Sequence, residues 1–252
     1  MSTTLMMERT AETSPRIRSA TSIGRIVGVL LLVHFAAGLI VPFVLLDRVR
    51  RPAGFLAGAA GSPVQVRAAV FLLFVGGAVA IGIAITAWPV FRRYSSAMAL
   101  WLLALAVAAF ALQAVDNGAL LSILSLSQEY AKADAAKLDL FQVLAGVVGS
   151  ARKWAHYTSL LVAVSWIFLL YSVLYRFRLV PRVLAAFGLV ASMLQITGVT
   201  LRGLLGYSPE TRLAMPLAPA YVALAVWLMV KGFDERHCPL QAEARGAEVA
   251  GA

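Results

Sequence analysis

Three polar side chains, Gln113, Asp116 and Asn117, stand within a long apolar stretch at residues 97–126. Their spacing of i, i+3 and i+4 places all three on one face of a helix. A carboxylate at the centre of a membrane costs about 2.5–3.5 kcal/mol on insertion scales, so it is normally paired, shielded or functional. Asp116 and its two neighbours are therefore the first candidates for a site.

Several other polar residues are expected at a similar depth. A helix rises about 1.5 Å per residue, and the hydrocarbon layer is about 30 Å thick. Counting from the basic inner ends of the apolar runs places four residues near the outer edge of the membrane: Asp116, Arg152, His156 and Arg202. His34 is expected near the midplane and Gln195 slightly further out, so these two are secondary candidates.

These residues allow three functional hypotheses. In the first, Asp116 with Arg202 or Arg152 holds a polar or charged small molecule in a pocket that opens outward, and the protein binds or passes it. In the second, Asp116 is the general acid or base of an intramembrane enzyme, assisted by His156, with a lipid or isoprenoid-like substrate. In the third, the chain is a non-catalytic accessory or sensory subunit that packs against another membrane protein.

Each candidate also has a structural interpretation. Asp116 can form an ion pair with Arg202 or Arg152 that locks helices together. His156 stands beside Trp154 and Tyr157, as in an aromatic belt at a membrane interface. His34 and Gln195 can hydrogen-bond to neighbouring helices and serve only in packing.

Composition places the whole chain in a membrane. It is 61% hydrophobic and 13% charged, with a mean hydropathy of +0.83, whereas soluble domains are about 45–50% apolar and about 25% charged. The net charge of +10 lies mostly at the ends of apolar runs, where basic residues meet lipid headgroups. The bilayer is therefore the predicted partner, and nucleic acid is not. A small-molecule ligand, a membrane-protein partner and a second copy of the chain all stay open.

Metal and redox chemistry are not indicated. The chain has one cysteine, Cys238, which cannot form an internal disulfide. No Cys/His cluster has the spacing of a zinc site. We therefore predict no metal and no cofactor.

The apolar runs predict an all-α polytopic bundle of six transmembrane helices. They lie at about 26–46, 68–91, 97–126, 155–174, 183–201 and 213–230, because a spanning helix needs about 20 apolar residues. Residues 22–233 form the predicted membrane domain, between a flexible cytoplasmic lead at 1–21 and a polar cytoplasmic tail at 234–252. The apolar run at 140–150 is too short to span, so it predicts a short interfacial or re-entrant helix.

Prolines suggest where the bundle opens. Pro42 lies in the outer half of the first run, and Pro216 and Pro219 lie in the outer half of the last. A proline inside a helix leaves one backbone carbonyl without its partner, and in a membrane that carbonyl needs protein, water or ligand. We expect a polar pocket opening outward, with the helix near 141–148 as its cover.

Basic residues in the tightest loops indicate the orientation. Arg92, Arg93 and the turn at 176–182 carry positive charge without any acid, which is typical of the cytoplasmic side. A basic cluster at 48–51 argues for the opposite orientation. We predict that both termini are cytoplasmic.

Three segments resemble a known family. They are WPVFRRYSSAMALW from Trp88 to Trp101, YRFRLVPR from Tyr175 to Arg182, and WLMVKGF from Trp227 to Phe233. They are similar to the bacterial membrane proteins that share the domain of unknown function 4386, and the likeness runs from the first span to Phe233. The resemblance implies a multi-pass protein of the bacterial inner membrane, and it supplies no catalytic residue.

Overall fold

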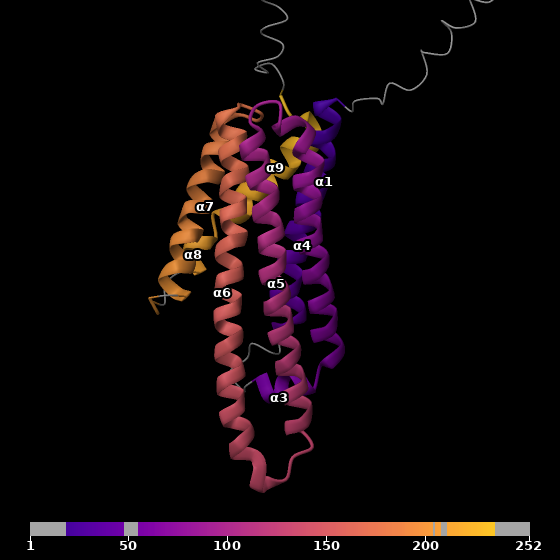
Figure 1. Cartoon of the computed structure of the whole chain (residues 1–252), viewed down its shortest axis with the longest axis vertical. Coiled ribbons are helices and arrows are strands. Elements are labelled where there is room, and N and C mark those ends of the chain that lie inside the picture. The colour runs from indigo at the N-terminus through magenta and orange to yellow at the C-terminus, as the bar shows by residue number, and fades with distance from the viewer. Residues whose placement is uncertain (1–18, 48–54, 204, 208–210, 235–252) are drawn as a thin grey trace, which may run out of the picture.

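Six long helices build the protein, as the computed structural model in Figure 1 shows; it describes residues 19–47, 55–203, 205–207 and 211–234. The long helices are α1 (Ala20–Ile40), α4 (Pro63–Phe91), α5 (Ser96–Tyr130), α6 (Leu138–Arg176), α7 (Arg182–Gly203) and α9 (Leu217–Lys231). Shorter segments are the π-helix η1 (Val41–Leu45), α3 (Phe55–Ala60), the 3-10 helix η2 (Ala135–Lys137) and α8 (Thr211–Ala214). The predicted all-α class is confirmed.

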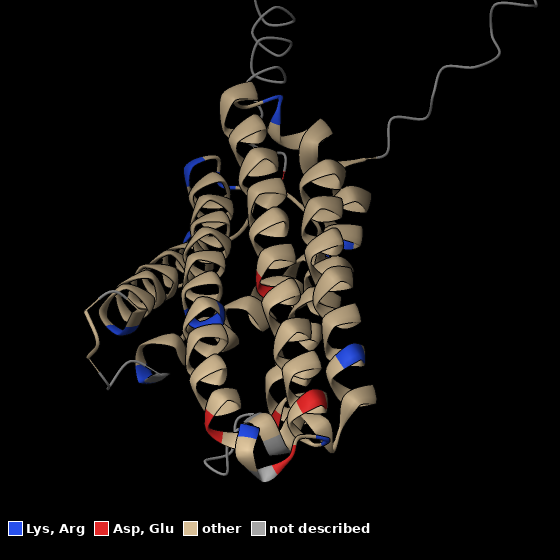
Figure 2. Cartoon of the chain, turned by 60° about the horizontal axis from the view of Figure 1, so that its bottom comes forward, with Lys and Arg blue, Asp and Glu red and all other residues tan. Residues whose placement is uncertain are grey.

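The helices are long and apolar enough to cross a membrane. Six segments meet this condition, and they correspond to the six predicted runs. Figure 2 shows that charged residues gather toward the ends of the bundle and in its turns, while most of the helical surface carries none. The prediction of a multi-pass membrane protein is therefore confirmed. The predicted lead and tail, with Cys238, lie almost wholly outside the described residues.

The extra short helix was placed at the wrong residues. Residues 140–150 are not a separate interfacial or re-entrant helix, because they form the continuous start of α6. Nothing in that segment stops a helix, since α6 contains no proline from Leu138 to Arg176. A short extra helix does exist, but it is α3 at Phe55–Ala60.

Prolines shape the first and last spans. Pro42 lies in η1, where Leu46 N–H donates to the Val41 carbonyl across five residues at 2.9 Å. The last span is divided, because a turn at Met215 and Pro216 separates α8 from α9. Pro216 has no backbone N–H, so it cannot continue the helical hydrogen bonds of α8. It is instead the N-cap residue of α9.

The long helices form a closed ring. Each packs on the next in the order α1, α4, α5, α6, α7 and α9, and α9 packs again on α1. At the end that carries residues 19 and 234, called here the proximal end, the Asp234 N–H donates to the Leu179 carbonyl at 2.9 Å. The distal end carries α3 and η2. There the Tyr130 and Phe141 rings of α5 and α6 lie 6.0 Å apart.

Glycines allow α1 and α9 to approach backbone to backbone. A Cβ on Gly28 would lie 2.7 Å from the Ala225 carbonyl oxygen, and one on Gly24 would collide with the Phe233 backbone. Gly24 and Gly28 are one turn apart, which is the spacing of small residues at close helix contacts in membranes. The first and last helices are therefore held together by direct contact.

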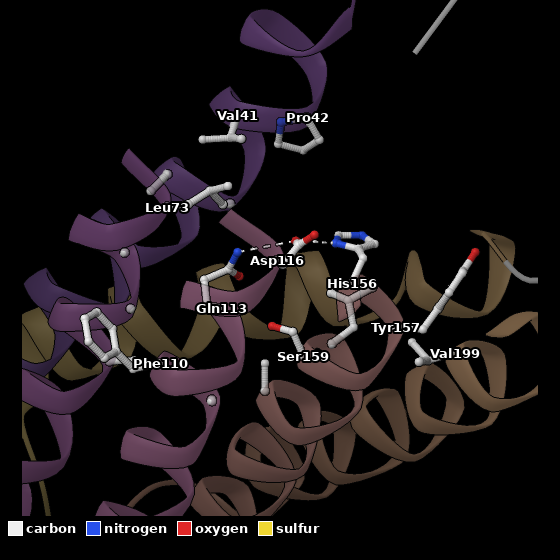
Figure 3. Close-up of a pocket in the computed structure, with 18 of the residues that line it drawn as sticks. Val41, Pro42, Leu73, Phe110, Gln113, Asp116, His156, Tyr157, Ser159 and Val199 are labelled. Atoms are coloured by element: carbon white, nitrogen blue, oxygen red, sulfur yellow. Dashed lines mark hydrogen bonds and ion pairs between the residues drawn. The ribbon is translucent and has the colours of Figure 1, made fainter. Parts of the chain in front are cut away.

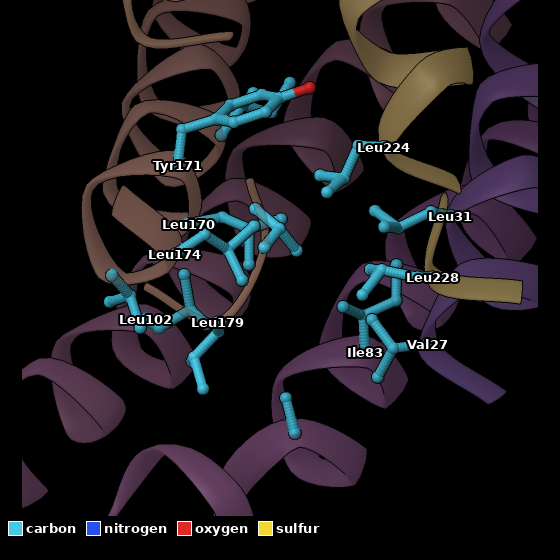
Figure 4. Close-up of a cluster of buried hydrophobic side chains, with 14 of the residues drawn as sticks. Val27, Leu31, Ile83, Leu102, Leu170, Tyr171, Leu174, Leu179, Leu224 and Leu228 are labelled. Atoms are coloured by element: carbon cyan, nitrogen blue, oxygen red, sulfur yellow. The ribbon is translucent and has the colours of Figure 1, made fainter. Parts of the chain in front are cut away.

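Two apolar clusters fill the ring at different levels. The larger one fills the proximal half, and Figure 4 shows its leucines from α1, α5, α6 and α9. The smaller one lies toward the distal end, where Val41 and Leu46 pack with Val70 of α4 and Leu124 of α5. At 1.5 Å per residue, the 35 residues of α5 extend about 52 Å and the 22 of α7 about 33 Å. The distal cluster is built mainly from η1, α4 and α5, with Ala59 of α3 and Val148 of α6 against it, and the polar residues of the interior lie between the two clusters.

Candidate functional site

A cavity of about 600 Å³ lies between the two apolar clusters. Its walls come from α1 with η1, α4, α5, α6, α7 and one residue of α8. Seven of the eight residues singled out from the sequence line it: His34, Gln113, Asp116, Arg152, His156, Gln195 and Arg202. The eighth, Asn117, is fully buried beside them. No residue from 141–148 lines the cavity, so the expectation that this segment covers the pocket was wrong.

Asp116 is the centre of a hydrogen-bonded network (Figure 3). Its carboxylate is 3% exposed, and Oδ2 lies 2.9 Å from His156 Nδ1 on α6. Gln113 Nε2 donates to the same oxygen at 3.4 Å and to Asn117 Oδ1 at 3.1 Å. The three residues that share a helix face therefore act as one unit, and His156 joins them from the next helix.

The direction of the His156 contact follows from the chemistry of the acceptor. An ionised carboxylate can only accept hydrogen bonds. His156 Nδ1 must then carry the proton that it donates to Asp116. The side chain of His156 is 44% exposed, so the other ring nitrogen, Nε2, is available to donate or accept at the cavity.

Arg152 faces the second oxygen of Asp116 without a hydrogen bond. Its Nε lies 3.8 Å from Asp116 Oδ1, which is an ion-pair distance but longer than a hydrogen bond. Both atoms are buried, and neither has a hydrogen-bond partner among the described residues. A buried polar atom without a partner costs about 1–3 kcal/mol, more when it is charged. Asp116 Oδ1 and Arg152 Nε therefore each lack a hydrogen bond that they are able to form.

The cavity is open at its side. Among its described lining residues, the exposed ones are Gly38 of α1 and Arg202 of α7. At the proximal end of the cavity, His34 Nδ1 lies 3.0 Å from the Gly76 carbonyl oxygen, and its ring meets Trp166 edge-on at 5.9 Å. His34 therefore both packs against a neighbouring helix, as its structural interpretation expects, and lines the cavity. Gln195 lines the opposite wall, on α7.

Sequence reasoning missed part of the wall that α6 contributes. Ser159 is 3% exposed, and Figure 3 shows its hydroxyl directed into the cavity. It belongs to a stripe at intervals of three and four residues, which is one face of a helix. The stripe consists of Arg152, His156, Ser159, Ala163 and Trp166, and all five line the cavity. This periodicity is visible in the sequence and could have found Ser159.

The fold and its interior define a class: a multi-pass helical membrane protein whose bundle encloses a cavity with polar groups on its wall. The sequence matches the model of a family described as Domain of unknown function (DUF4386) over residues 26–232. The chain belongs to this family, as the three sequence segments indicated. No curated protein and no solved structure matches the chain. Among the described residues, no three His, Cys, Asp or Glu side chains are grouped to hold a metal ion.

Proposed function

We propose that the cavity binds a small molecule with a polar head and an apolar body. The observation that carries this proposal is the Asp116 network, because Asp116 and Arg152 both line the cavity, and Asp116 Oδ1 and Arg152 Nε have no hydrogen-bond partner among the described residues. A polar ligand group that reaches this pair would satisfy both atoms. Away from the network the walls are apolar, with Leu72, Leu73 and Phe110 available to a hydrocarbon body.

The size and composition of the cavity agree with a ligand of this kind. Small-molecule sites in proteins are typically 300–1,000 Å³, mostly apolar, and carry a few converging polar groups. A cavity of about 600 Å³ in which Gln113, Arg152 and His156 converge on Asp116 falls in this range. An ion pair that only holds two helices together requires neither a cavity of this volume nor buried polar atoms without hydrogen-bond partners.

On α1 and α7, the lining residues lie in the half of each helix that is nearer the distal end. With the termini in the cytoplasm, as the basic loops at 92–93 and 176–182 favour, this half lies in the outer leaflet. We therefore infer that the ligand is taken up from the outer side of the membrane, and that the protein holds it or passes it inward.

A ligand screen tests the proposal. The purified protein is heated in detergent with a panel of carboxylates, amines, sugars and single-chain lipids, and unfolding is followed by circular dichroism. A ligand at 100 times its Kd stabilises the folded state by about 2.7 kcal/mol. We expect at least one class to do so, and Asp116→Asn to abolish the effect.

Glu129→Gln is the matched control, because Glu129 is an exposed acid of the same helix. It is expected to leave ligand stabilisation unchanged. A panel that stabilises neither the wild type nor Glu129→Gln contradicts the proposal, and so does stabilisation that survives Asp116→Asn in full.

One observation also favours an enzyme. Asp116 fixes His156 through Nδ1, which leaves Nε2 free to act as a general base on a bound molecule. The test incubates the wild type and His156→Gln with total membrane lipid and compares the products by mass spectrometry. A product made only by the wild type supports catalysis, and identical lipid profiles rule it out for these substrates.

A further inference from the structure

The opening of the cavity lies where one helix of the ring is short. α9 separates α1 from α7, and it runs antiparallel to α1. Gly28 contacts Ala225, and the Phe35 and Tyr221 rings stack at 5.7 Å. This register places Leu217, where α9 begins, opposite Gly38. Beyond Gly38, the flank of α1 that faces α7 is not covered by α9, as the oblique course of α9 in Figure 1 also indicates.

Large apolar side chains are exposed beside this opening, next to the exposed Arg202. On the α1 side, Phe43 is 68% exposed and Val44 is 64% exposed. On the other side, Met215 follows α8 and is 68% exposed. Exposed side chains of this kind suit contact with hydrocarbon and not with water. The opening therefore faces the bilayer.

The charged groups inside favour an anion. The charged residues in the cavity lining are Asp116, Arg152 and Arg202, so two guanidinium groups stand beside one carboxylate. Arginine presents a planar fork of donors that matches carboxylate and phosphate oxygens. Since Arg202 is exposed at the opening, a head group that enters there meets a cation first.

We propose that the ligand is an anionic amphiphile with a single hydrocarbon chain, and that it enters sideways from the bilayer between α1 and α7. The head, a carboxylate or a phosphate, binds at Arg152 and Arg202. The chain extends past Phe110 and Ala106 of α5 toward the proximal end of the cavity. This inference rests on the proposed function and specifies its ligand and the route of entry.

The experiment uses the full chain in phosphatidylcholine vesicles with nitroxide-labelled amphiphiles. Electron paramagnetic resonance measures the fraction of label that the protein immobilises. The probes are a labelled fatty acid, a labelled single-chain lipid phosphate and a labelled fatty alcohol of the same length. We expect at least one of the two acids to be immobilised severalfold more than the alcohol, and the stronger of them identifies the head group. Arg152→Gln and Arg202→Gln are expected to remove this difference.

A glycine pair tests the entry route. A Cβ at Gly38 or at Gly82 meets no atom within 4 Å, so a larger side chain fits the backbone at both positions. Gly38 lies at the opening, whereas Gly82 does not line the cavity. Gly38→Phe is expected to reduce immobilisation at least tenfold and Gly82→Phe to leave it unchanged, with circular dichroism showing that both variants fold.

The outcomes separate this inference from the proposed function. Equal immobilisation of alcohol and acids, or full binding in Gly38→Phe, overturns the anionic head or the lateral route while the cavity still binds. Full competition by inorganic phosphate overturns the amphiphile in favour of a soluble anion. If no labelled amphiphile is immobilised although a soluble compound stabilises the protein, the inference fails and the proposed function stands. If nothing binds in either assay, both fail.

Discussion

Removing the carboxylate of Asp116 is expected to destabilise the bundle more than removing any exposed acid. Asp116 joins α5 to α6 through His156 Nδ1 at 2.9 Å and faces Arg152 Nε at 3.8 Å. In Asp116→Ala, His156 Nδ1 and Gln113 Nε2 lose an acceptor and Arg152 loses its counter-charge, at a position that is 3% exposed.

The magnitude follows from three terms. Breaking a buried ion pair by deleting one partner costs about 3–5 kcal/mol when the remaining charge stays buried. Arg152 retains 26% exposure and His156 44%, so both can turn partly toward the opening, which lowers the cost. Hydrogen bonds between membrane helices average about 0.6 kcal/mol and reach about 1.7. We therefore expect a loss of about 2–3 kcal/mol.

The assay is unfolding in mixed micelles with increasing sodium dodecyl sulfate, followed by helical circular dichroism. Glu129→Ala is the control, because Glu129 pairs with Lys132 in an exposed salt bridge at 3.0 Å, a type worth about 0–1 kcal/mol. A double-mutant cycle of Asp116→Ala with His156→Ala isolates the contact between α5 and α6. If Asp116→Ala costs no more than Glu129→Ala, the network does not stabilise the bundle, and the reasoning is refuted.

Two further predictions concern helix packing and orientation. Gly28→Val is expected to lower the free energy of unfolding by about 1–3 kcal/mol, because its side chain meets the α9 backbone. Gly82→Val, which meets nothing, is its control in the same unfolding assay, and equal losses would contradict the contact. The orientation is tested with single-cysteine variants in which Cys238 is replaced by serine. A cysteine at Lys132 is expected to react with a membrane-impermeant maleimide added to intact cells, whereas a cysteine at Arg178 is not. Labelling of Arg178→Cys alone would reverse the predicted orientation.

Sequence reasoning reached the main features of the site because spanning helices share one scale of depth. Counting residues from the basic helix ends brought Asp116, Arg152 and His156 to one level, and in the structure Asp116 faces both of the other two. The count required only the rise of a helix and the thickness of the membrane. It therefore needed no knowledge of which helices are neighbours.

Features that depend on which helices pack against each other could not be predicted from the sequence. The run at 140–150 is too short to span alone, but it is joined to the next run, and nothing in the sequence stops the helix between them. Gly24 and Gly28 have a recognisable spacing, yet the sequence does not state that their partner is the last helix. The lateral opening results from where α9 begins relative to Gly38, a register that only packing defines.

The contact between α1 and α9 also has a consequence for the order of assembly. Among the described helices, α1 is synthesised first and α9 last, so the surface at Gly24 and Gly28 has no partner until four other long helices have been synthesised. During that time the chain is an open row of helices, because only α9 packs on both α1 and α7. A chain that terminates before α9 would present a glycine surface suited to close helix contact, and a second truncated chain could occupy it. Insertion of α9 is thus the step that turns a linear array of helices into a closed ring.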